Sequence, residues 1–120
     1  MKVIKFGGSS LADAKQIKKV CSIVLSDRQR RIVVVSAPGK RDGNDTKVTD
    51  LLISLAQTCR DNGDVDAALD AVVERYASIA KDLHLGKEIV NTIKKDLKGR
   101  ISKQTDNYNM FEDLLKAAGE

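Results

Sequence analysis

The segment that most constrains this chain is Lys5–Ser10, with the sequence KFGGSS, which follows the short apolar run Val3–Ile4. This order of residues predicts a strand over Lys2–Phe6, a tight glycine turn, and a helix directly behind it. Glycine has no Cβ and tolerates positive φ, so a ligand can approach the backbone of such a turn closely. The turn amides, the Lys5 ammonium and the Ser9 hydroxyl together form a positive concavity of the kind that binds phosphate.

The spacing of this segment leaves two interpretations open. Its lysine precedes the glycines, whereas the common phosphate loop places the lysine after them, in G-x-x-x-x-G-K-[ST]. The segment is not a G-x-G-x-x-G fingerprint either. A Gly-Gly-Ser turn is also ordinary punctuation between two elements. From spacing alone, both a phosphate site and a plain turn remain possible interpretations.

The next elements complete a strand–helix–strand unit. Apolar residues at three-four spacing predict an amphipathic helix over Leu11–Leu25, with Ser10 as its N-cap. The run Ile32–Val35 is apolar on both faces, which is typical of a central parallel strand covered by helices. In such units ligands gather at the carboxyl ends of the strands. We therefore expect Lys5–Gly8 and Ser36–Gly39 to lie at one edge of the sheet.

A charged loop and a further helix follow the second strand. The loop Ser36–Lys47 is rich in lysine, arginine and aspartate, and it is either a solvated surface loop or a mobile substrate flap. A helix is predicted from Val48 to about Arg60. Thr49 is a candidate N-cap, and Asp50 favours the positive end of the helix.

The rest of the chain, from residue 64 to residue 118, is predicted to be helical. Helices are expected over Val65–Leu85, ended by Gly86, over Glu88–Leu97, broken near Gly99, and over Asn107–Ala118. Two strands are too few for a doubly wound domain, and they leave sheet edges unpaired.

Composition limits the possible partners. The net charge of +4 is spread along helical faces, and aromatic residues make up 3% of the chain. Nucleic-acid binding favours a coherent basic stripe with aromatic platforms, so we expect no nucleic-acid partner. No stretch approaches the roughly 20 apolar residues of a membrane span, and lysines interrupt the apolar start. The sequence therefore predicts a cytoplasmic protein that does not enter membranes.

The two cysteines indicate neither a metal site nor a redox pair. Cys21 and Cys59 lie in different helical segments, outside any C-x-x-C or metal-ligand spacing. We interpret both as reduced thiols, with Cys21 on an apolar helix face, and we assign no metal ligand in this chain.

The start of the chain resembles a known signature. Residues Met1–Leu11 are similar to the N-terminal segment of the aspartate kinases (aspartokinases), in the amino-acid kinase family, which carries K-F-G-G-[ST]-S after its first strand. Phe6 favours this group over acetylglutamate, glutamate and uridylate kinases. Ser9 stands where threonine is commoner, and it keeps the hydroxyl.

Two later segments extend the resemblance. The strand end Ser36–Ala37, followed by the helix start Thr49–Leu52, resembles the amino-acid site of aspartokinases, with a longer charged loop between the two parts. Residues Ala117–Glu120 resemble the family's small-x-Gly-Glu element, with alanine where serine is usual.

The resemblance implies an α/β fold. Residues 1–120 would form the N-terminal, amino-acid-substrate portion of a three-layer α/β/α sandwich of the amino-acid-kinase type, helix-rich in this part. The family's Arg-Gly-Gly-Ser-Asp-like segment, its nucleotide half and its ACT regulatory domains have no counterpart in these residues. We therefore expect an N-terminal fragment that is inactive by itself.

The resemblance also implies a reaction. Aspartokinases use ATP and Mg²⁺ to phosphorylate the side-chain carboxylate of L-aspartate to 4-phospho-L-aspartate, the first step toward lysine, threonine and methionine. The full-length chain would form a homo-oligomer. Lys5 would be the catalytic residue that pairs with the transferring phosphates. The implied ATP-binding residues are Lys5, Phe6, Gly7, Gly8 and Ser9, and the implied aspartate-binding residues are Ser36, Thr49 and Glu120.

Two alternatives remain. One is another amino-acid kinase that acts on a different acid, although Phe6 and the segment around Thr49 argue against it. The other is a non-catalytic helical binding or assembly module that keeps the motif without turnover. The missing nucleotide half favours this second alternative for the chain by itself.

Overall fold

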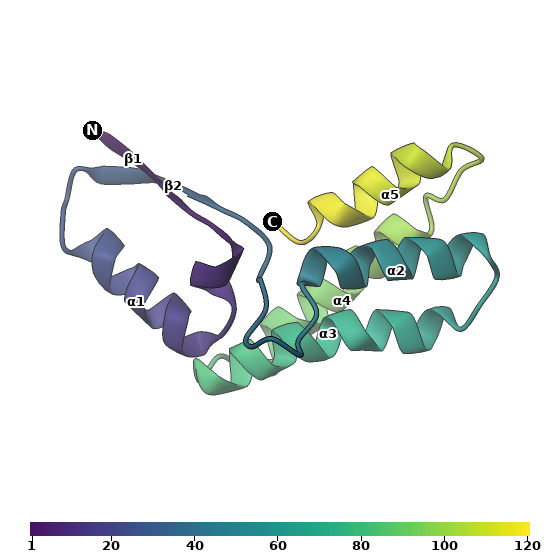
Figure 1. Cartoon of the computed structure of the whole chain (residues 1–120), viewed down its shortest axis with the longest axis horizontal. Helices are drawn as coiled ribbons and strands as arrows, with labels where there is room; N and C mark the ends of the chain where they lie inside the picture. The colour runs from purple at the N-terminus through teal and green to yellow at the C-terminus, as the bar shows by residue number, and fades with distance from the viewer.

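The computed structural model describes all 120 residues as a small sheet unit joined to a helical unit (Figure 1). In chain order the elements are β1 (Lys2–Phe6), the 3-10 helix η1 (Gly8–Leu11), α1 (Ala14–Leu25), β2 (Arg30–Val35), α2 (Val48–Arg60), α3 (Val65–Asp82), α4 (Lys87–Ile101) and α5 (Tyr108–Ala117). The radius of gyration is 15.4 Å, against about 13.6 Å for a compact domain of this length. The sheet unit therefore projects from the helical unit.

The predicted strand–helix–strand unit is confirmed. β1 pairs with β2 in parallel, and Phe6 lies opposite Val35 at the carboxyl ends of the two strands. α1 packs on the sheet through a small cluster of Phe6, Leu11 and Val20. Because the strands are parallel, the glycine turn after β1 and the loop after β2 leave the sheet at the same edge.

The expectation that the second strand is covered on both faces is wrong for this chain. The side chains of Ile32–Val35 are 37–44% exposed, because only α1 packs on the sheet while α2–α5 gather in the other unit. Cys21 on α1 is also exposed rather than part of an apolar contact, whereas Cys59 is buried.

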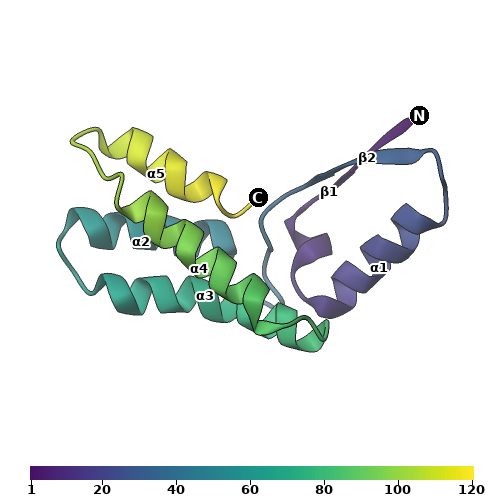
Figure 2. The ribbon, with the colours of Figure 1, turned by 180° about the vertical axis from the view of Figure 1, so that it is seen from behind.

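The helical unit carries the main core. α2 packs against α3 and α5, and α3 packs against α4. Viewed from behind, α4 lies in front of α2 and α3 (Figure 2). Leu55 and Val72 have no exposed surface, and Phe111 is 2% exposed. The core is almost wholly aliphatic, as the scarcity of aromatic residues requires.

Both predicted N-caps near the glycine turn and the charged loop are wrong. Residues Gly8–Leu11 form η1, and α1 begins later, with Asp13 as its N-cap accepting a hydrogen bond from the Gln16 amide at 2.9 Å. Lys47 holds the N-cap position of α2 without a side-chain hydrogen bond. Thr49 is thus free of a capping role.

Two predicted helix ends are also wrong. α3 ends at Asp82, and His84 adopts the left-handed conformation with φ of 58°, whereas Gly86 is the N-cap of α4. Gly99 does not break α4, which continues to Ile101. A helical glycine costs about 1 kcal/mol, and the burial of Leu97 in the preceding turn offsets this cost.

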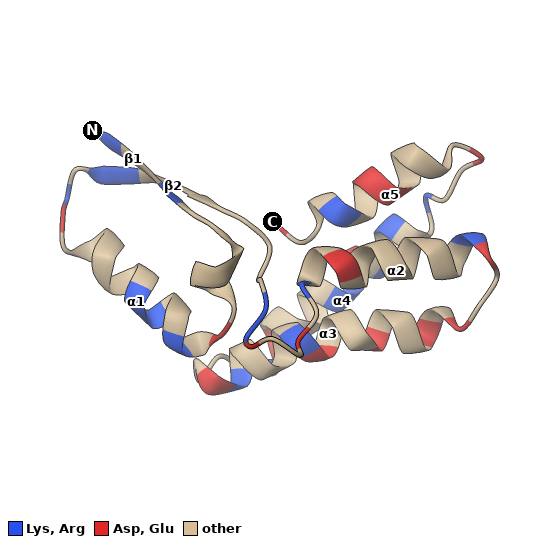
Figure 3. Cartoon of the chain, viewed as in Figure 1, with Lys and Arg blue, Asp and Glu red and all other residues tan.

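Charges of both signs are distributed over α2–α5, whereas the charged residues of α1 are all lysines (Figure 3). No helix of the structure combines the length and the apolar character that crossing a membrane requires.

Candidate active site

A polar cavity of about 530 Å³ lies where the sheet unit meets the helical unit. Its lining residues come from η1, the loop after β2, the start of α2 and the end of the chain: Gly8, Ser9, Ser36, Ala37, Pro38, Gly39, Lys40, Lys47, Thr49 and Glu120. In Figures 1 and 2 the chain end after α5 points toward the end of β2. The cavity therefore joins segments that are far apart in the sequence.

The two glycine-containing turns touch each other at this cavity. The Gly39 amide donates a hydrogen bond of 2.8 Å to the Gly8 carbonyl. A Cβ on Gly39 would lie 2.8 Å from the Gly8 carbonyl carbon, and a Cβ on Gly8 would lie 3.0 Å from the Ala37 oxygen. No glycine has positive φ, so the expectation that the glycine turn uses a positive φ is wrong. Glycine is needed here because two backbones approach closely.

Gly7 differs from Gly8. Its backbone is extended, with φ of −80° and ψ of 174°, and a Cβ built on it would have no atom within 4 Å. Among the bonds of the turns and loops, neither the Gly7 amide nor the Gly8 amide is a donor. Open space beside free amides is what an anionic ligand requires.

The structure separates Lys5 and Phe6 from the other site residues. Phe6 is 8% exposed and packs against Leu11 and Val20, so its side chain belongs to the core of the sheet unit. Lys5 is exposed on β1 and does not line the cavity.

The three residues expected to bind substrate do come together. Ser36, Thr49 and Glu120 all line the cavity, together with Gly8 and Ser9. A Cβ on Gly119 would lie 3.0 Å from the side chains of Ala37 and Leu52, so the chain end packs tightly against the end of β2. This close approach places Glu120 beside residues from the other unit.

The charged loop folds back on itself. The Arg41 guanidinium forms two hydrogen bonds to the Asp45 carboxylate, at 2.7 and 2.9 Å, and the Arg41 amide adds a third. These bonds hold the pKa of the Asp45 carboxyl well below its usual range. The Val48 amide donates to the Pro38 carbonyl at 3.0 Å, which ties the end of the loop to its beginning.

Sequence reasoning missed four residues of this region. Lys40 and Lys47 line the cavity, but they looked like any other charges of a polar loop. Arg75 and Tyr76 lie behind the cavity on α3. A signal for Arg75 was present, because it stands three residues after Val72 and so falls within the apolar stripe of its helix.

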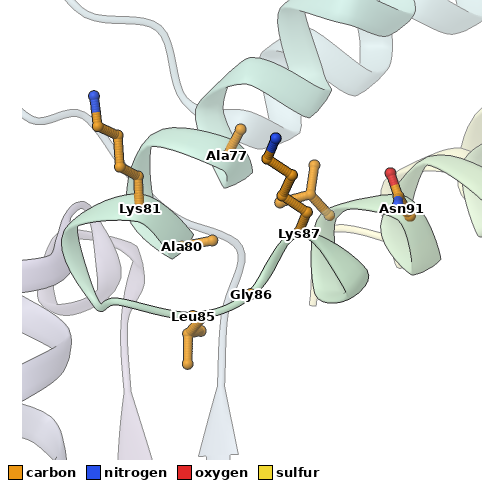
Figure 4. A pocket seen from close by; sticks show the side chains of 8 residues that line it. Ala77, Ala80, Lys81, Leu85, Gly86, Lys87 and Asn91 are labelled. Atoms are coloured by element: carbon orange, nitrogen blue, oxygen red, sulfur yellow. The ribbon is translucent and has the colours of Figure 1, made fainter.

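A second hollow, of about 490 Å³, lies where α3 ends and α4 begins. In Figure 4 the Lys81 side chain extends away from Leu85, and Ala77 and Ala80 offer no polar atoms. This hollow lacks the convergent polar groups of a substrate site.

Comparison with known proteins identifies the fold. The profile of the amino acid kinase family matches residues 1–119. The chain belongs to the amino acid kinase family. The structure of Clostridium acetobutylicum aspartate kinase superposes on 98% of the chain with a TM-score of 0.84 and 34% sequence identity, and the chain covers 26% of that enzyme. The α/β arrangement is therefore that of the N-terminal part of an amino acid kinase.

Individual members of the family are similar over most of the chain. The chain is 50% identical over its whole length to aspartokinase 3 of Bacillus subtilis, of which it spans 26%. It is 37% identical over 82 residues to the aspartokinase of Chlamydia trachomatis, spanning 16% of that protein. Escherichia coli aspartokinase III in complex with aspartate and ADP superposes on 98% of the chain, with a TM-score of 0.71, 27% identity and 26% of that enzyme covered.

Proposed function

We propose that the full-length protein is an aspartate kinase, which transfers the γ-phosphoryl group of ATP to the side-chain carboxylate of L-aspartate. The observation that carries the proposal is the polar cavity, in which Ser9 of the glycine turn meets Ser36, Thr49 and Glu120. The similarity to aspartokinases from several organisms supports the choice of substrate. The product would be 4-phospho-L-aspartate.

The proposed chemistry depends on positioning and charge. The aspartate carboxylate is already ionised at neutral pH, so attack on the phosphorus needs no general base. The amides of Gly7 and Gly8 would donate to the phosphate oxygens, and the Ser9 hydroxyl would add a further donor. Lys5 would neutralise charge on the transferring group from its exposed position at the end of β1. The Phe6 side chain, in contrast, would support the turn from within the core.

The other end of the cavity suits an amino acid. Glu120 would pair with the ammonium group of aspartate, and Ser36 and Thr49 would donate hydrogen bonds to its oxygens. Lys40 and Lys47 place two positive charges beside the same space. Two cations would favour a substrate with two carboxylates over one with a single carboxylate.

Mg²⁺ would enter with ATP. No three metal-ligating side chains lie together in the chain, and Glu120 is the one carboxylate that lines the cavity. Magnesium keeps several waters and is commonly held by substrate phosphates with one or two carboxylates. The bound ion would reduce repulsion between the two anionic substrates, while the residues that line the cavity orient them.

Several broader features remain part of the proposal. The chain spans 26% of Bacillus subtilis aspartokinase 3 and of Clostridium acetobutylicum aspartate kinase. We therefore propose that the full-length protein binds the adenine of ATP and forms a homo-oligomer, and that these 120 residues alone are inactive. Use in the synthesis of lysine, threonine and methionine, and a cytoplasmic location, accompany the aspartokinase assignment.

A trapping assay tests this function. Acyl phosphates react with hydroxylamine to give hydroxamates, so the full-length protein with Mg²⁺, ATP and L-aspartate should form aspartyl hydroxamate. L-glutamate and N-acetylglutamate serve as matched acids, and product from either without product from aspartate would favour the alternative amino-acid kinase. Absence of product with every acid would favour the assembly module. In the Lys5→Ala variant kcat should fall by about 100-fold or more, as for loss of one electrostatic donor, with the fold retained.

A further inference from the structure

Two consecutive residues of α3 hold the walls of the cavity from behind. Arg75 is 5% exposed and is the one charged residue among the buried set. Its Nη1 donates to the Ala12 carbonyl at 2.9 Å, and its Nη2 donates to the Gly39 carbonyl. Neither Arg75 nor Tyr76 lines the cavity, so any influence of these residues on a substrate passes through the backbone that they hold.

The Arg75 guanidinium links the two glycine turns. Ala12 directly follows η1, and Gly39 donates its own amide to Gly8. One planar side chain therefore fixes both the far end of the phosphate turn and the loop that touches its start. Lysine has no comparable fork, because its donors radiate from a single nitrogen.

Stability alone is a poor explanation for Arg75. Its Nε is buried without a partner, and the nearest carboxylate contact is Asp45 Oδ2 at 3.6 Å from Nη2. Burial lowers the pKa of Arg75, although the group stays charged at neutral pH. A buried charge with an unpaired donor is often less stabilising than an apolar side chain of similar volume. The role of Arg75 is therefore to hold the two glycine turns in position relative to each other.

Tyr76 performs the same task at the other wall. Its hydroxyl donates to the Gly119 carbonyl at 3.0 Å, one residue before Glu120. Burial raises the pKa of Tyr76 to about 12, so the hydroxyl remains a donor at neutral pH. Consecutive helical residues point about 100° apart, which lets one helix reach two separate walls.

We propose that Arg75 and Tyr76 are positioning residues for the proposed kinase reaction: Arg75 sets the spacing of the two glycine turns, and Tyr76 sets the position of Glu120. This inference rests on the proposed function. It predicts a division of effects. Loss of Arg75 misaligns the phosphate with its acceptor and lowers kcat, whereas loss of the Tyr76 hydroxyl weakens the grip on aspartate and leaves the KM for ATP unchanged.

The test compares four variants of the full-length protein. Arg75→Met removes the guanidinium at similar volume, Arg75→Lys restores the charge without the fork, and Tyr76→Phe removes one hydroxyl. Arg100→Met is the matched control, because Arg100 likewise bonds a backbone carbonyl, that of Leu114 at 2.7 Å, but between α4 and α5 and away from the cavity. Thermal unfolding midpoints are measured first, and the kinetics of all variants are then measured at one temperature below the lowest midpoint.

The expected kinetic effects differ between the variants. For Arg75→Met we expect kcat to fall by about 100-fold, the scale of a misplaced reactive group, and for Arg75→Lys a smaller fall. For Tyr76→Phe we expect the KM for aspartate to rise about fivefold, the loss of one hydrogen bond of about 1 kcal/mol. For Arg100→Met we expect a lower midpoint with kcat and both KM values within twofold of the wild type. Wild-type kinetics in Arg75→Lys and Tyr76→Phe would overturn the proposal, even if Arg75→Met fails to fold.

Hydrogen exchange separates this inference from the proposed function. Peptides covering residues 37–48 contain the Gly39 amide that bonds Gly8. If the wild-type protein has no aspartate-dependent activity, the proposed function fails, and exchange alone decides about the spacing of the turns. Faster exchange of these peptides in Arg75→Lys than in Arg100→Met would support the role of Arg75, and equal exchange in both would overturn it.

Discussion

A methyl group at Gly39 should separate the two turns that build the cavity. The added Cβ would lie 2.8 Å from the Gly8 carbonyl carbon and 2.9 Å from the Gly8 oxygen and the Ser9 nitrogen. All three are backbone atoms, so no flexible side chain can move aside. An ordinary carbon contact is about 3.5 Å, so the turns must part by roughly 0.7 Å.

The cost of Gly39→Ala follows from this displacement. Overpacking by one methyl group costs about 1–3 kcal/mol, and the 2.8 Å hydrogen bond from Gly39 to Gly8 is lost or lengthened. A misplacement near 1 Å lowers the rate by about 100-fold, so kcat/KM for aspartate should fall between about 10-fold and 100-fold.

Gly43 supplies the matched control. It lies in the same loop, but a Cβ on Gly43 would have no atom within 4 Å. Gly43→Ala should therefore leave kcat/KM unchanged and stability unchanged or higher by about 0.4–1 kcal/mol. Thermal unfolding and steady-state kinetics of the two full-length variants provide the comparison. Wild-type stability and kinetics in Gly39→Ala would show that the two turns do not meet as described.

Three further predictions use other residues of the site. Gly7→Ala should retain the wild-type unfolding midpoint, because its Cβ faces open space, yet it should weaken ATP binding in titration calorimetry. Gly8→Ala should lower both the unfolding midpoint and the affinity for ATP. Lys47→Met should raise the KM for aspartate by roughly 10-fold to 100-fold, since a hydrogen bond to a charged group contributes about 1.5–3 kcal/mol; unchanged KM would remove Lys47 from the site. The bonds from Arg41 lower the pKa of Asp45 in the folded state, so they stabilise the fold fully at pH values above the unfolded-state pKa of about 3.9. This stabilisation is lost as the pH falls through the folded-state pKa. Asp45→Asn should therefore be less stable than wild type at pH 7 in denaturant titrations, with a difference that shrinks below about pH 4; a constant difference would contradict the assigned ion pair.

Much of the fold could be predicted because its signals are local. The strand Lys2–Phe6 and the helix Val48–Arg60 have the predicted bounds, since each is a clear apolar run or stripe between turn residues. Helix ends were less predictable. Asp13 rather than Ser10 caps α1, because a 3-10 turn intervenes and sequence spacing does not distinguish it from the first turn of an α-helix.

The position of the site was predictable, but its construction was not. Ser36 and Thr49 meet in the cavity because parallel strands end at one edge, a rule that sequence patterns can use. The contacts of Arg75 span 63 and 36 residues along the chain, and no local pattern indicates which carbonyls a buried guanidinium will bind. The close approach of Gly39 to Gly8 depends in the same way on how two loops pack.

The most direct measurement is a crystal structure of the full-length protein with L-aspartate and a non-hydrolysable ATP analogue. Our account predicts that the aspartate ammonium contacts Glu120, that its oxygens contact Ser36 and Thr49, and that the γ-phosphate lies against the amides of Gly7 and Gly8. Aspartate bound elsewhere, with this cavity holding only water, would contradict the account.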